Sequence, residues 1–178
     1  MAALIPAGSA SGTGTVTLTI PNTNNTQTAT LPDATGTVMI SGNMPAFSAY
    51  ASTGTAISAS TWTKITLDTK SFDTNNNFSS SRFTPTVAGY YQISAAINLS
   101  SSAIQTYWIS IYKNGSVWQY GTLYTTSLGV GGVNNMSSLV YLNGSTDYIE
   151  LYGYSSTAQT LGTGFPFTYM NGILVRTA

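Results

Sequence analysis

The sequence of 178 residues contains no cysteine and no histidine, and only 6% of its residues are charged. Without cysteine, the chain has no disulfides, no thiolate metal sites and no cysteine nucleophile. Without histidine, histidine-based acid–base catalysis and triads of serine, histidine and aspartate are excluded. We therefore expect a protein that is not an enzyme and that uses no cofactor and no metal ion.

The few charges balance, because five basic and five acidic side chains give a formal net charge of zero. Five scattered cations cannot neutralise a run of phosphates, so we expect no nucleic-acid binding. The first residues lack the basic flank and apolar run of a signal peptide, and no apolar segment approaches the ~20 residues that span a bilayer. We expect neither a signal peptide nor membrane insertion.

The residues that are present favour β-structure, because apolar and polar side chains alternate over several segments. Within residues 89–99 most odd-numbered side chains are apolar, and Gln92, Ser94 and Asn98 lie between them. Residues 107–112 and 148–152 repeat this period of two. With frequent glycine and asparagine turns, the pattern predicts an all-β sandwich.

The first 44 residues differ from the remainder, because no aromatic residue occurs before Phe47. Residues 15–20 and 37–40 are short strand candidates with little apolar material for a core of their own. Strands of this kind become stable when several chains wrap together. We predict a β-rich N-terminal stem for attachment over residues 1–44 and a separate head over residues 45–178.

Four motifs, in order along the head, resemble the globular head of complement component one q. In the first motif, a phenylalanine stands six positions before a glycine, and an aromatic residue stands two positions after that glycine. The four motifs are Phe83–Tyr91, residues 112–115, Leu142 with residues 147–151, and residues 171–175. The resemblance covers roughly residues 45–176 and implies a jelly roll of about ten strands, of the tumour-necrosis-factor type, assembled as a homotrimer. Ile93 and Ala95 depart from it, since aromatic residues usually occupy those positions. No collagen stalk is present, so immune recognition is not implied.

Residues 30–38, Thr-Leu-Pro-Asp-Ala-Thr-Gly-Thr-Val, are similar to short segments of bacteriophage tail-fibre and other structural proteins. This similarity implies a trimeric virion protein, either a tail fibre or a fibre tip, on the exterior of the tail or capsid. It would be assembled in the host cytoplasm, joined to other virion proteins through residues 1–44, and would bind a host-surface glycan or protein through its head. Two alternatives remain open: a capsid decoration or head fibre without a specific receptor, and a bacterial lectin-like module.

The turns predict where such binding would occur. Asn114-Gly115 and Asn143-Gly144 predict tight type I′ turns, whereas the connections 99–104, 125–135 and 155–165 are long. Up-and-down strands place the tight turns at the stem-facing end and the long loops at the distal end. Because loops on a rigid scaffold often carry recognition, we predict a receptor site there. The candidate residues are Ser101, Tyr124, Thr126, Asn134, Tyr154, Gln159, Phe165 and Phe167.

The carboxylates offer little for catalysis. Asp147 and Glu150 lie three positions apart in a candidate strand, on opposite faces, and we expect each to be solvated or locally hydrogen-bonded. Asp68 and Asp73 lie near Asn75, Asn76 and Asn77, an oxygen-rich loop, but the spacing is not that of a calcium-binding EF-hand. We interpret this segment as an ordinary loop.

Aromatic residues are abundant, with twelve tyrosines and three tryptophans. A modest sandwich cannot easily hide so many, so we expect some to pack between subunits. Trp108, Tyr112 and Trp118 could also bind a ligand, but we predict that they pack in the core or in the trimer.

Overall fold

A computed structural model describes residues 24, 44–99, 104–125, 131–164 and 167–178. The chain divides into two units, residues 1–37 and 38–178, and all the strands described below belong to the second. The stem predicted for residues 1–44 lies outside the described residues, apart from Asn24 and Met44.

The head is the all-β sandwich that the alternating pattern predicts. Its described residues form β1 (Ala46–Tyr50), β2 (Ala56–Ile57), β3 (Thr63–Lys64), β4 (Thr69–Asp73), β5 (Phe78–Ser79), β6 (Arg82–Phe83), β7 (Ala88–Leu99), β8 (Thr106–Lys113), β9 (Ser116–Thr125), β10 (Gly132–Asn143), β11 (Ile149–Ser155), β12 (Gln159–Thr160) and β13 (Tyr169–Thr177). In this part of the chain no helix is long and apolar enough to cross a membrane.

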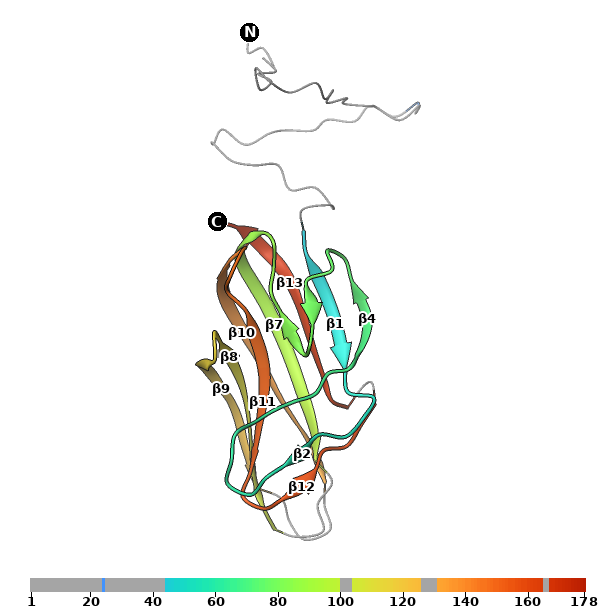
Figure 1. The fold of residues 1–178 in the computed structure, drawn as a ribbon, viewed down its shortest axis with the longest axis vertical. Coiled ribbons are helices and arrows are strands. Elements are labelled where there is room, and N and C mark those ends of the chain that lie inside the picture. Colours follow the sequence, from blue (N-terminus) through green and yellow to red (C-terminus); the bar gives the residue numbers. More distant parts are fainter. Residues whose placement is uncertain (1–23, 25–43, 100–103, 126–130, 165–166) are drawn as a thin grey trace. The chain divides into compact units, whose positions relative to one another are not determined.

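Two antiparallel sheets face each other in the head (Figure 1). The first has the strand order β10-β7-β13-β1-β4, and the second has the order β5-β6-β11-β8-β9, with β3 also paired to β11. The chain changes sheet between β7 and β8, between β9 and β10, and between β10 and β11. This crossing of the chain between two packed sheets produces a jelly roll.

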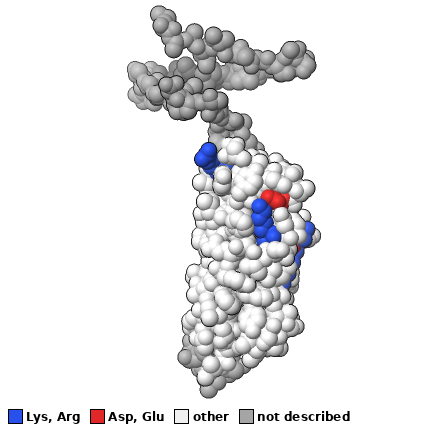
Figure 2. Space-filling view, turned by 90° about the vertical axis from the view of Figure 1, so that its left-hand side faces the viewer, with Lys and Arg blue, Asp and Glu red and all other residues white. Residues whose placement is uncertain are grey.

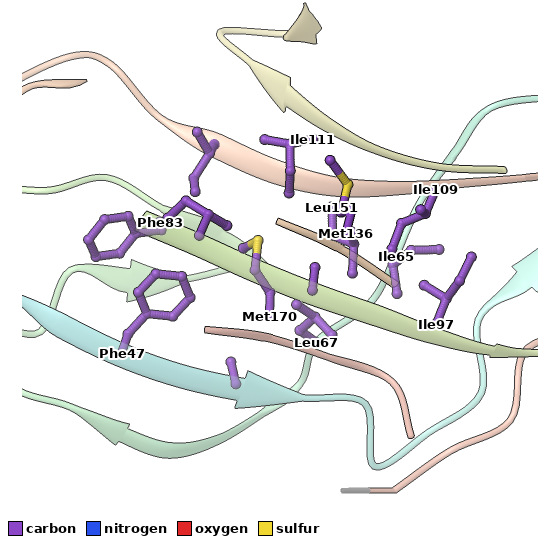
Figure 3. Close-up of a cluster of buried hydrophobic side chains, with 14 of the residues drawn as sticks. Phe47, Ile65, Leu67, Phe83, Ile97, Ile109, Ile111, Met136, Leu151 and Met170 are labelled. Carbon is purple, nitrogen blue, oxygen red and sulfur yellow. The ribbon is translucent and has the colours of Figure 1, made fainter. Parts of the chain in front are cut away.

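The core lies between the two sheets and is built mainly from the inward residues of β1, β7, β8, β10, β11 and β13 (Figure 3). Tyr91, Ile93 and Ile97 of β7 are fully buried, as the alternation predicts. At one end of the core, the ring of Phe47 stacks on those of Phe78 and Phe83, with centroids 5.1 and 4.2 Å apart. The period of two therefore decides which side chains of the long strands enter the core.

The first Asn-Gly pair forms the predicted hairpin turn. Lys113 of β8 pairs with Ser116 of β9, and the two residues between them have positive φ angles, 52° at Asn114 and 79° at Gly115. Positive φ at both central positions is the geometry of a type I′ turn.

The predicted type I′ turn at Asn143-Gly144 does not form, because Gly144 has a positive φ angle but Asn143 does not. The strands on either side, β10 and β11, belong to different sheets, and residues 144–148 connect them. The Asn143 side-chain oxygen accepts hydrogen bonds from the backbone N–H groups of Ser145, Thr146 and Asp147, at 2.9–3.0 Å. The pair therefore begins a crossover between sheets, because an asparagine side chain can close a turn that no strand pairing continues.

The strand registers place the connections at two ends of the head. Leu174 donates its backbone N–H to Pro45, and Ala178 donates to Ala88, so the beginning of β1 and the end of the chain share one end, here called the proximal end. Leu99 pairs with Gly132, and Thr106 pairs with Thr125, at the opposite or distal end. The strand ends that flank the long connections are therefore distal, as predicted (Figure 1).

The predicted bounds of two distal loops need correction. Thr125 ends β9, and Asn134 and Asn135 lie within β10, so the loop predicted over 125–135 is shorter. The connection 155–165 contains β12, which pairs with β2. Thr and Asn alone do not distinguish a strand end from a loop, because neighbouring strands decide how far pairing extends.

A stability prediction arises at the turn between β5 and β6. Ser80 and Ser81 have positive φ angles of 51° and 56°, which cost an ordinary residue roughly 1–2 kcal/mol each. Because Ser80 is exposed, we expect Ser80→Gly to stabilise the head by about 0.5–1 kcal/mol in urea unfolding. The control is Ser81→Gly, which removes the hydroxyl that bonds both backbone groups of Leu67 and should destabilise the head. Equal effects of the two substitutions would contradict this explanation.

Candidate interaction surfaces

The acidic side chains of the head are engaged in structural contacts. Glu150 is only 3% exposed and accepts hydrogen bonds from Lys64 Nζ at 2.6 Å and from Arg82 Nε at 2.9 Å. The expectation that Glu150 is solvated or locally bonded is therefore wrong, because its partners lie 86 and 68 positions away. Asp147 binds Asn114 and Lys113 at the proximal end.

The carboxylates in and near the oxygen-rich loop accept hydrogen bonds from backbone N–H groups. Asp73 accepts hydrogen bonds from the backbone N–H groups of Asn77 and Phe78, and Asp68 accepts from those of Ser52 and Thr53. Among the described residues, no group of three or more histidine, cysteine, aspartate or glutamate side chains could hold a metal ion.

The hydrogen bonds to Asp68 predict that part of the head's stability is lost in acid. Hydrogen bonds from the Thr53 hydroxyl and from the backbone of Ser52 hold the pKa of Asp68 far below its ordinary value. A lowered pKa in the folded state contributes stability that is complete above about pH 4 and is lost as the pH falls below it. We expect Asp68→Asn to lower the unfolding free energy at pH 7 and to flatten its fall towards pH 2, as measured by urea titration. An unchanged slope would contradict this assignment.

The solvent-facing side of the first sheet is apolar over much of its area. We call this surface the apolar face; its exposed large side chains are Phe72, Tyr90, Val133, Leu139, Tyr141, Ile173 and Val175. Leu139 and Ile173 both pair with Gln92 of β7, so they lie on either side of one central position. Seven exposed large side chains on one face, with polar residues such as Gln92 between them, favour an interaction surface.

A hollow of about 400 Å³ lies within the apolar face, over β1, β7 and β13. Phe72 and Ile173 are among its lining residues, together with Ser48, Ser94 and Asn171. Because the Ser48 hydroxyl already donates to Asn171 Oδ1 at 2.8 Å, part of this polar lining is satisfied internally. The hollow can therefore accept an apolar side chain without leaving that pair unbonded.

The edge strand β9 presents a second apolar surface. Within the described sheets β9 pairs only with β8, and Trp118 and Tyr124 are exposed along it. Trp118 lies 5.6 Å from Lys113 Nζ, which is also 5.7 Å from the ring of Tyr141 in β10. Trp118 lies near the proximal end of β9, and Tyr124 lies near its distal end, where its ring is close to Gly132 at the beginning of β10. We call these two residues the edge patch.

The outer side of the second sheet carries a cluster of aromatic rings that we call the aromatic cluster. Trp62 lies at its centre, with ring centroids 5.5–6.2 Å away, and Tyr112 stacks on a further ring at 3.8 Å. The members are Trp62, Trp108, Tyr112, Tyr120, Tyr152 and Tyr154. Trp108 and Tyr112 are therefore outside the main core, contrary to the core alternative, whereas Trp118 belongs to the edge patch.

The five predicted receptor residues that the structure describes lie in different surroundings. Tyr124 and Phe167 are exposed near the distal end. Asn134 is only 3% exposed, with its amide bonded to the Thr122 carbonyl, while Gln159 accepts from the Tyr107 hydroxyl. Tyr154 belongs to the aromatic cluster. The remaining candidates, Ser101, Thr126 and Phe165, lie outside the described residues.

Charge is unevenly distributed over the head. On the side seen in Figure 2, charged side chains lie in the half nearer the proximal end, and the described surface of the distal half shows none.

The sequence analysis did not identify Trp62 as a member of a surface site. A tryptophan between polar residues before a short strand was the available signal, but its partners belong to three other strands.

Comparison with known proteins supports the fold. No protein-family model and no curated protein matches the sequence. The globular domain of zebrafish complement 1qA protein is 17% identical with a TM-score of 0.57, over 75% of this chain and 98% of that chain. Murine APRIL at pH 5.0 is 9% identical with a TM-score of 0.58, over 74% of this chain and 99% of its own. Eiger TNF from S. frugiperda is 6% identical with a TM-score of 0.54, over 76% of this chain and 93% of its own. The jelly roll that the motifs imply is thus confirmed as a fold.

Proposed function

We propose that the chain is a non-enzymatic, homotrimeric fibre protein of a bacteriophage virion whose head binds a carbohydrate or protein on the host surface. The observation that supports the trimer most directly is the apolar face, whose seven large side chains are exposed in the single chain. Packing the edge patch of one subunit against the apolar face of the next would bury both. Contacts between two different patches close into a ring when the rotation permits, and a ring of three matches this proposal.

Light scattering of the purified chain tests the assembly. We expect the native chain to be a trimer and Leu139→Glu with Ile173→Glu to be monomeric, because two carboxylates would be buried unpaired in the interface. The matched control is Leu123→Glu. Leu123 is 53% exposed against 54% for Leu139, but it pairs with Trp108, which faces the outer side of the second sheet. A monomeric native chain would contradict the trimer.

The virion assignment rests on residues 30–38, and the binding role is proposed for the distal end, where Phe167 is exposed beside uncharged loops. Antibody labelling of virions in electron microscopy tests both points. Labelling at a fibre tip, with antibodies against the head blocking adsorption, is the expected result. Labelling on the capsid without an effect on adsorption would favour the decoration protein.

A further inference from the structure

We propose that the aromatic cluster is a binding surface for a neutral saccharide, so that the sheet face, rather than the distal loops, makes the principal contact with a host glycan. This inference rests on the proposed host-surface binding and names its partner class and its place. Six rings lie together on one face, and five of them come from three neighbouring strands. Aromatic rings accept the C–H side of a pyranose, whereas their polar atoms bond its hydroxyls.

The sheet holds the rings in fixed positions. Trp108 pairs with Tyr154, and Ser110 pairs with both Tyr152 and Tyr120, so these side chains follow the register of three paired strands. The segment before Trp62 is held by a hydrogen bond from Ser60 N–H to the Ser155 carbonyl at 2.8 Å. A surface built on paired strands is preorganised, which reduces the entropy lost when a ligand binds.

The cluster retains groups that a saccharide can use. Tyr120 is 48% exposed, and the other rings are partly exposed. In the described part of the chain, no hydrogen bond engages the hydroxyls of Tyr112, Tyr120, Tyr152 or Tyr154. Burial raises the pKa of Tyr112, and the nearby Tyr120 and Tyr152 raise it further, so its hydroxyl remains a donor at neutral pH.

The charges beside the cluster match an uncharged ligand. Glu150 lies next to Tyr152 in β11, and both nearby cations, Lys64 and Arg82, are bound to its carboxylate. An anionic ligand would have to compete for these cations, and a cationic ligand for the same carboxylate. A neutral saccharide can bind without breaking either ion pair of Glu150. The cluster also lies on the other sheet from the apolar face.

Titration of the full chain with neutral hexasaccharides, using cellohexaose, maltohexaose and chitohexaose as probes, tests this proposal. The readouts are calorimetry and tryptophan fluorescence, which reports on Trp62 and Trp108. We expect at least one probe to bind, with Tyr120→Leu weakening the binding about tenfold, which corresponds to ~1.4 kcal/mol, because one ring contact with the saccharide is lost. Trp62→Ala removes the ring at the centre of the cluster and should also weaken binding.

The control variant is Phe167→Ala at the distal end, and light scattering of every variant checks assembly separately. Loss of binding in Phe167→Ala alone would overturn this inference while supporting the distal-loop site of the proposed function. Binding of hexagalacturonate but of no neutral probe would also overturn it, as would no saccharide binding at all. A trimeric chain that binds no saccharide would leave the proposed assembly standing, whereas a monomeric chain that binds would refute the trimer alone.

Discussion

Gly144→Ala is expected to destabilise the head by about 2–5 kcal/mol, the sum of a left-handed backbone cost and of overpacking. Gly144 has φ +71°, and a Cβ there would lie 2.3 Å from the backbone nitrogen of Ala88 and 2.7 Å from the backbone carbon of Val87. Backbone cannot rotate away as a side chain can, so the crossover and the beginning of β7 must move apart. Urea unfolding of the purified chain measures the change.

The matched control is Gly115→Ala, at the other Asn-Gly pair. Gly115 has a similar φ of +79°, but the nearest atom to an added Cβ is the Tyr148 hydroxyl at 3.6 Å. Only the backbone cost remains, and we expect about 1–2 kcal/mol. If both substitutions cost the same, close approach of the crossover to β7 would not be the reason for glycine at position 144.

Replacing both cations of the buried carboxylate, Lys64→Met with Arg82→Met, is expected to cost about 3–5 kcal/mol at pH 7, because it leaves a buried charge without a partner. Glu150 cannot reach water easily, since its side chain is 4% exposed, whereas the side chains of Lys64 and Arg82 are 32% and 42% exposed. The expected size approaches the whole stability of a marginal domain. Thermal and urea unfolding both measure it.

Removing the other partner provides the contrast. In Glu150→Gln the two cations turn to solvent, and the amide retains hydrogen-bonding capacity, so we expect a loss of about 1 kcal/mol. A larger loss in Glu150→Gln than in the double variant would show that the cations, rather than the carboxylate, depend on the pairing.

Local sequence features correctly predicted much of the fold. The alternation over residues 89–99 predicts the buried side of β7, and Asn114-Gly115 predicts its turn, because both depend on neighbouring residues only. The same reasoning failed at Asn143-Gly144, since an identical dipeptide can precede a strand of either sheet. The end at which the long loops lie followed from the order of the strands, and it was predicted correctly.

The candidate site was predicted less well than the fold. Asn134 was placed in a loop, but β10 pairs with β7 along its whole length and turns that side chain inward. Glu150 alternates with Ile149 and Leu151, so the pattern places it on the outer face, yet Lys64 and Arg82 cover it there. The residues that cover an outer face come from distant segments of the chain, so the local pattern cannot predict which ones they are.

By itself, the sequence determined that this chain has no thiol or imidazole chemistry, that its head is an all-β sandwich, and which side of the strand over residues 89–99 enters the core. Composition and a period of two are enough for these conclusions, because each side chain's face depends only on its position along its own strand. The tertiary structure alone decided that Trp62 lies among four rings, that Glu150 is buried with two cations, and that Gly144 touches β7. These contacts join residues that are distant in sequence. Only the packing of the strands and of the segments that cover them brings such residues together.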